Sequence, residues 1–154
     1  MGALSLKAGN WWGWIFTSAA VLLIWGYLRY GTIHVAFQAH LRGEDAAVER
    51  YLAQTRFPGF LRPSDRSYFD FLSGIVAVQK GEHTRAREHF DRAVLGPLRT
   101  DNMRSVIFCH LAAIAIAEDD PKLAAAHLEK AKSTPHRSET DEMIAKLEKS
   151  LAEG

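Results

Sequence analysis

The chain carries an internal repeat with a period of 38 positions, and this repeat constrains the fold more than any other feature. Its clearest copy has Gly74 in an apolar segment, Gly81 at a turn, and Ala86, Phe90 and Ala93 in the next segment. The equivalent positions one period later and one period earlier are Ala112, Asp119, Ala124, Leu128 and Ala131, and Ala36, Gly43, Val48, Leu52 and Thr55. A unit of this length cannot bury its apolar face alone, so the pattern predicts a solenoid of stacked units.

Small residues at fixed places in each unit indicate that the unit is a helical hairpin. Two helices approach closely only where small residues lie at their crossing, and a large apolar residue then fills the remaining gap. The predicted crossings are Gly74 with Ala86 and Ala112 with Ala124. Gly43 and Gly81 suit the turn because a left-handed backbone costs glycine little. Asp119 can occupy the same corner through its side chain, with Pro121 beginning the next helix.

This pattern resembles the tetratricopeptide repeat family, which places a small residue in the first helix of each unit and Ala, an aromatic residue and Ala in the second. The resemblance covers Arg29 to His136 and lacks the family's tryptophan and tyrosine. The usual period of the family is about 34 residues. We expect the extra residues between hairpins, at Phe57-Pro58-Gly59, Gly96-Pro97 and Pro135-His136, where proline and glycine stop helices.

The amino-terminal segment from Trp11 to Tyr30 is apolar, with no charged residue between Lys7 and Arg29. About 20 helical residues match the ~30 Å hydrocarbon core of a bilayer. Aromatic residues gather at its two ends, as they do at membrane interfaces. These predicted anchors are Trp11, Trp12, Trp14, Trp25, Tyr27 and Tyr30. A cleaved signal peptide and a buried core helix are the alternatives, but no small-x-small cleavage site follows, and three clustered tryptophans are unusual in a small core.

The predicted fold is therefore all-α. A tail at 1–10 precedes a single transmembrane helix at 11–30, which continues into three hairpins at 29–138 and a capping helix at 139–154. Met143, Leu147 and Leu151 recur every four residues in the last segment, as in a terminal helix that closes a stack. Arg29 and Arg42 against Lys7 favour a cytoplasmic repeat domain in a single-pass membrane protein.

Charge and cysteine content limit the classes of function. The 19 Lys and Arg balance 18 Asp and Glu to give a net charge of +1, which argues against nucleic-acid binding. Cys109 is the only cysteine, so an intramolecular disulfide and a thiolate-rich metal site are excluded. The seven histidines make no i, i+4 pair. No phosphate loop or catalytic constellation is found, and we expect neither an enzyme nor a cofactor or metal.

The resemblance implies that the first helix of each unit lines a concave surface where partners bind. By helical phase, the predicted partner-binding residues are Tyr68, Phe71, Ile75, Val78, Val106, Cys109, Ala113 and Ile116. They form an apolar surface with hardly any charged residue, so recognition of an acidic tail is not expected. The leading hypothesis is a scaffold or assembly subunit that binds protein partners in a membrane complex and contacts the lipid bilayer. The alternative is a homo-oligomeric structural protein that organises the membrane surface.

Overall fold

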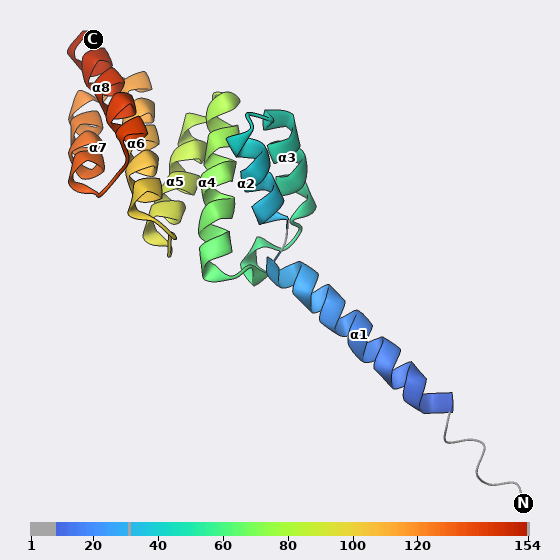
Figure 1. Ribbon diagram of the computed structural model, residues 1–154. Coiled ribbons are helices and arrows are strands. Elements are labelled where there is room, and N and C mark those ends of the chain that lie inside the picture. The colour runs from blue at the N-terminus through green and yellow to red at the C-terminus, as the bar shows by residue number, and fades with distance from the viewer. Residues whose placement is uncertain (1–8, 31, 154) are drawn as a thin grey trace, which may run out of the picture.

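The computed structural model describes residues 9–30 and 32–153, and within these ranges the regular structure is entirely helical. The helices are α1 (Gly9–Tyr30), α2 (Ile33–Leu41), α3 (Asp45–Gln54), the 3₁₀ turn η1 (Pro58–Phe60), α4 (Pro63–Gln79), α5 (His83–Leu95), α6 (Asp101–Ala117), α7 (Pro121–Ser133) and α8 (Ser138–Glu153). Figure 1 shows α2 to α8 side by side in one body, from which α1 extends as a separate rod. The all-helical prediction is confirmed for the described residues.

Three antiparallel hairpins form the body: α2 with α3, α4 with α5, and α6 with α7. We call them the first, second and third hairpins. The second packs against the first through α4 and against the third through α5 and α6, while α8 covers α6 and α7 (Figure 1). This arrangement is that of a helical repeat, in which each unit buries its apolar face against its neighbours.

The turns of the three hairpins share one backbone conformation and recur at the spacing predicted from sequence. Gly43, Gly81 and Asp119 have φ angles of 71°, 73° and 59°. The amide of the residue after each turn donates to a carbonyl near the end of the preceding helix: Glu44 to Ala39, Glu82 to Ala77 and Asp120 to Ala115, each at 2.9 Å. These bonds satisfy carbonyls that a helix end leaves unpaired. The period is therefore present in the backbone.

The predicted crossings explain why the second and third hairpins close. A Cβ atom added to Gly74 would lie only 2.7 Å from the ring of Phe90. Because Gly74 has no side chain, this ring can pack directly against α4. Ala86 and Ala93 in α5 are fully buried beside it. The third hairpin repeats the arrangement with Ala112, Ala124, Leu128 and Ala131, all buried.

The first hairpin differs from the other two in the length of its first helix. Helix α2 has 9 residues, whereas α4 and α6 have 17 each. Helix α2 begins at Ile33, and the Thr32 hydroxyl just before it donates to the Tyr51 carbonyl at 2.7 Å. Helix α2 is thus about half as long as the first helices of the other two hairpins.

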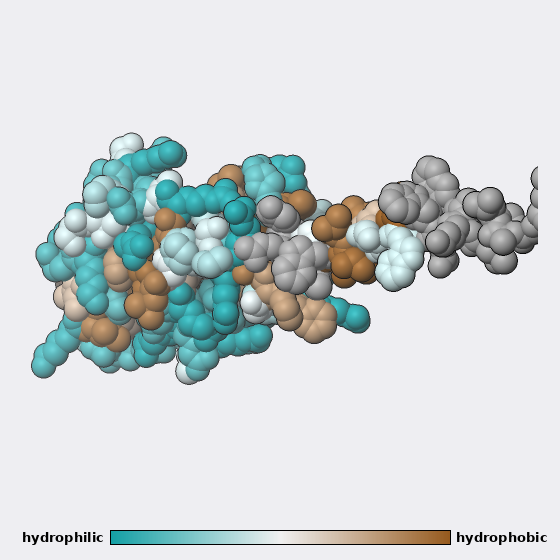
Figure 2. Space-filling model, turned by 90° about the horizontal axis from the view of Figure 1, so that it is seen from below, coloured by the Kyte–Doolittle hydropathy of each residue, from teal (hydrophilic) through white to brown (hydrophobic). Residues whose placement is uncertain are grey.

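The prediction of a transmembrane helix at 11–30 is wrong. Among the residues that the structure describes, no helix is both long enough and apolar enough to cross a bilayer. Helix α1 has 22 residues, but its aliphatic run from Ala19 to Ile24 covers only about 9 Å of helix. Tryptophan, tyrosine, glycine, serine and threonine surround that run, and the first two favour the membrane interface over the hydrocarbon core. Figure 2 shows the short hydrophobic band of α1 beside paler residues.

The predicted aromatic anchors are described only in part. The Trp14 side chain is 71% exposed on α1, which also speaks against a buried core helix. The side chains of Trp11, Trp12, Trp25, Tyr27 and Tyr30 lie outside the described residues. The predicted orientation in a bilayer rested on the same helix.

Candidate protein-interaction site

The structure divides the eight predicted partner-binding residues into two groups. Tyr68, Phe71, Ile75 and Cys109 are buried, and Val78, Val106, Ala113 and Ile116 are half-buried. Helix α4 is covered by α5 of its own hairpin and by α2 and α3 of the first hairpin, and α6 is covered by α7, α8 and α5. Phe71 and Cys109 therefore belong to the core of the closed domain and have no surface to offer a partner, whereas Tyr68 keeps 9% of its surface exposed.

Cys109 also lacks the chemistry of a reactive thiol. Its side chain is fully buried, and burial raises the pKa of the thiol to about 11. The thiolate is the nucleophilic form, so this side chain is not activated near neutral pH. Cys109 therefore acts here as a small apolar residue between α6 and the helices that cover it.

Phe71 lies in a cluster of four rings that joins the three hairpins. Its ring centroid is 5.7 Å from that of His40 in α2, 6.2 Å from Phe90 in α5 and 6.2 Å from His110 in α6. His110 stacks on Phe90 with centroids 5.2 Å apart and planes 7° from parallel. Burial, and secondarily the charge of His40, lowers the pKa of His110 to about 4, so this ring is neutral at pH 7. No sequence signal indicates this cluster, because its members come from four different helices.

A groove of about 440 Å³ lies between α2 and the start of α4, and we call it the first-helix groove. It is lined by Ile33, His34, Phe37, Gln38, Arg62, Asp65, Tyr68 and Arg99. Of the residues predicted from sequence, only Tyr68 lines it. The groove exists where α2 lacks the turns that α4 and α6 have, and the short first helix is therefore its structural cause.

The first-helix groove combines an aromatic floor with charged groups. Phe37 meets Tyr68 edge to face, with ring centroids 5.2 Å apart. The Arg99 guanidinium lies 5.6 Å from the centroid of the Tyr68 ring and donates to the Asp65 carboxylate at 3.4 Å. Arg62 adds a second guanidinium to the lining. The sequence predicts an uncharged surface and misses Arg99 because this residue lies in the connection between α5 and α6, outside the first helices.

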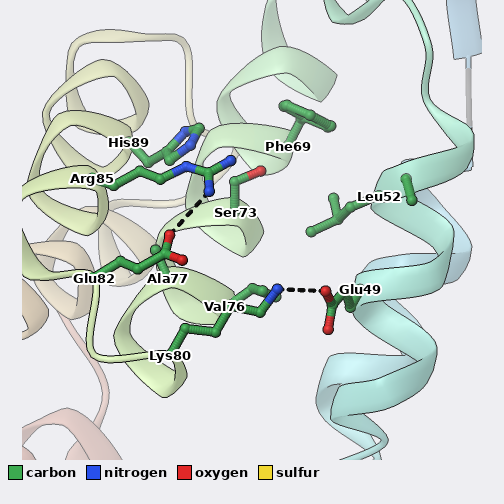
Figure 3. A pocket seen from close by; sticks show the side chains of 11 residues that line it. Glu49, Leu52, Phe69, Ser73, Val76, Ala77, Lys80, Glu82, Arg85 and His89 are labelled. Atoms are coloured by element: carbon green, nitrogen blue, oxygen red, sulfur yellow. Dashed lines mark hydrogen bonds and ion pairs between the residues drawn. The ribbon is translucent and has the colours of Figure 1, made fainter.

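A second cavity, of about 230 Å³, lies on the other side of the same contact, between α3, α4 and α5, and we call it the inter-hairpin cavity (Figure 3). It is lined by Glu49, Leu52, Ala53, Phe69, Ser73, Val76, Ala77, Lys80, Glu82, Arg85 and His89. Ion pairs between Lys80 and Glu49 and between Arg85 and Glu82 border it. The charged groups are thus at its rim, while Leu52, Phe69 and Val76 supply apolar walls.

The polar clusters elsewhere in the described ranges link helices together. The Asp70 carboxylate, 9% exposed in α4, lies 3.0 Å from His89 Nδ1 and accepts from Arg92 Nε at 3.1 Å. Ser105 donates to the Ala131 carbonyl at 2.8 Å and so connects α6 with α7. Within residues 9–30 and 32–153, no group of three or more His, Cys, Asp or Glu side chains is placed to hold a metal ion.

Comparison with known proteins finds no matching family model, curated protein or solved structure. The first-helix groove and the inter-hairpin cavity both lie at the contact between the first and second hairpins, so this contact is the candidate interaction site.

Proposed function

We propose that this chain is a helical-repeat scaffold of the tetratricopeptide type, which holds a protein partner in the first-helix groove as one subunit of a larger assembly. Three features support the repeat type: the internal period, the small residues at the hairpin crossings, and the Ala, aromatic, Ala series at Ala86, Phe90 and Ala93. The function of such a protein is binding, and the proposed activity involves no bond breaking.

The observation that carries this proposal is the composition of the first-helix groove. Aromatic residues and arginine are enriched at the centres of protein interfaces, because both bury much apolar area and still offer directed polar contacts. Phe37 and Tyr68 provide the apolar floor, and Arg99 holds its guanidinium over that floor. A partner segment would place an apolar side chain on the two rings and a hydrogen-bond acceptor beside Arg99.

Site-specific photocross-linking tests this function. A benzoylphenylalanine residue at Gln38, which lines the first-helix groove and is exposed, should become cross-linked to a protein partner in cells. The same residue at Glu88, which is exposed on α5, is the matched control. The Arg99→Glu change should remove the Gln38 product, and Lys122→Glu on α7 should leave it. Equal products from Gln38 and Glu88, or a Gln38 product that survives Arg99→Glu, would contradict the proposal.

Self-association is the second candidate, and exposed apolar residues on α1 favour it. Phe16 and Leu23 are 69% and 75% exposed and lie seven residues apart, on one face of the helix. Exposed apolar patches of this kind commonly mark interaction sites. If copies associate through α1, light scattering should give a mass above 17.2 kDa for the full chain and a lower mass for Phe16→Glu/Leu23→Glu. A monomeric full chain would contradict this second candidate.

A further inference from the structure

The repeat allows the inter-hairpin cavity to be compared with the equivalent place one unit later. Phe69, Ser73 and Val76 of α4 face the first hairpin, and all three are half-buried. The residues one period later are Ile107, Leu111 and Ile114 of α6, which are 0%, 2% and 3% exposed at the contact with the second hairpin. Where the second contact has the aliphatic side chain of Leu111, the first contact has only the small side chain of Ser73.

The inter-hairpin cavity is large enough to hold one aliphatic side chain such as leucine. A cavity of about 150 Å³ with apolar walls is large enough to bind benzene or xenon. The inter-hairpin cavity has about 230 Å³, so one aliphatic side chain fits. Ala53, Lys80 and Arg85 line it and are exposed, which means that it reaches the surface. Figure 3 shows Ser73 on α4 facing the gap toward Leu52 of α3.

The charges around the cavity select an uncharged occupant. Lys80 pairs with Glu49, Arg85 with Glu82, and His89 with Asp70. Each charged or titratable side chain that lines the cavity thus already has a partner, and a charged occupant would lose its hydration without gaining a new pair. An aliphatic side chain loses no such hydration, and its burial is favourable.

We propose that the inter-hairpin cavity is a socket for one leucine-like side chain, delivered by an uncharged segment of a protein partner. The inference rests on the proposed function as a partner-binding scaffold. It places a second point of attachment on the side of the first contact opposite the first-helix groove. Leu111 indicates the chemistry of the occupant, because it is the side chain that the repeat itself places at this position in the next unit.

Selection from a random dodecapeptide display library on the full chain tests the socket. We expect enriched peptides that share one Leu, Ile or Met whose replacement by Ala removes binding. Burial of such a side chain corresponds to roughly 10- to 100-fold in affinity. Affinity for these peptides should therefore fall by at least about tenfold in Ser73→Leu, which fills the socket from within. Ser150→Leu, the same change at an exposed position of α8, is the matched control and should bind like the wild type.

A second variant keeps the test decisive if Ser73→Leu alters the fold. Ala53→Leu would narrow the mouth of the socket from α3, and it should weaken the same peptides. Peptides that bind both socket variants normally and are lost only in Arg99→Glu would overturn this inference while supporting the first-helix groove. Failure to enrich any peptide would also overturn the socket, whereas the cross-link from Gln38 would still report separately on the proposed function.

Discussion

The contact between the first and second hairpins and the contact between the second and third use equivalent helix positions, but they are filled differently. Ile107, Leu111 and Ile114 seal the second contact, whereas Phe69, Ser73 and Val76 leave a cavity at the first. The ion pairs at the two rims also correspond. Glu49 pairs with Lys80 at the first contact, and the residues one period later, Arg87 and Glu118, pair at the second contact. The two pairs have their charges in opposite order. Geometry is thus kept by the repeat, while the identity of single side chains decides which contact is open.

This difference suggests a division of roles between the two contacts. The second contact also holds the stack of His110 on Phe90, and close packing of this kind contributes to stability. The first contact has the first-helix groove on one side and the inter-hairpin cavity on the other. We therefore expect substitutions at the second contact to change stability most, and substitutions at the first contact to change binding.

The largest expected change in stability comes from removing the aliphatic side chain of Leu111 from the second contact. Leu111→Ser would give the second contact the residue found at the first, and it should destabilise the domain by about 4 kcal/mol, because it leaves a cavity and buries a hydroxyl. Val76→Ser at the half-buried first contact should cost less than half as much. Urea denaturation followed by circular dichroism measures both, and equal losses would break the comparison.

Acid should weaken the second contact through His110. The pKa of this residue is about 4 in the fold and near 6.5 in the unfolded chain, so the unfolded chain takes up the proton first. Its contribution to stability is complete above pH 6.5 and is lost as the pH falls toward 4, by about 3 kcal/mol in all. The free energy of unfolding measured from pH 7.5 to 4.5 should fall more steeply for the wild type than for His110→Phe. Parallel curves would mean that His110 does not carry this dependence.

A smaller loss of stability is expected when a side chain added to α4 pushes against the Phe90 ring. Gly74→Ala would bring a methyl group within 2.7 Å of the Phe90 ring, which stacks on His110 on another side. We expect a net loss of about 1–3 kcal/mol, since overpacking outweighs the better helix propensity of alanine. Gly59→Ala is the matched control, because nothing lies within 4 Å of its added methyl group. Thermal melts that rank the two variants equally would mean that Phe90 yields without cost.

The smallest effect is expected from the charges at the rim. The double change Glu49→Lys and Lys80→Glu exchanges the two charges of this ion pair, so that the first contact has the same charge order as Arg87 and Glu118 at the second. Both side chains are about half exposed, so the exchange should change stability by less than about 0.5 kcal/mol. Denaturation at low and high salt measures it. A change above about 1 kcal/mol would show that rim charges, and not apolar filling, distinguish the two contacts.

The sequence predicts the repeat well because its signals are local. A small residue at a crossing and a glycine or aspartate at a turn are fixed by backbone geometry, which is why Gly74, Gly81 and Asp119 could be placed in advance. The sequence predicts less well which side chains of the first helices are exposed to a partner. Helical phase gives the direction of Phe71 and Cys109 but not the neighbouring hairpins that bury them.

The remaining differences also have physical causes. The groove depends on the short α2 and on Arg99 from a connection, and a repeat pattern encodes neither feature. The cavity depends on one serine, whose meaning emerges only when the two contacts are compared in space. For α1, length and aromatic placement favoured a span, but the aliphatic run between the tryptophans is short.

Native-state hydrogen exchange of α3 and α7, in the wild type and in Ser73→Leu, tests most directly whether one side chain leaves the first contact open. Amides of α3 should exchange faster than those of α7 in the wild type, because the contact that holds α3 is incompletely filled. Ser73→Leu should slow exchange in α3 and leave α7 unchanged. Equal protection of the two helices in the wild type, or exchange in α3 that does not respond to Ser73→Leu, would contradict the account.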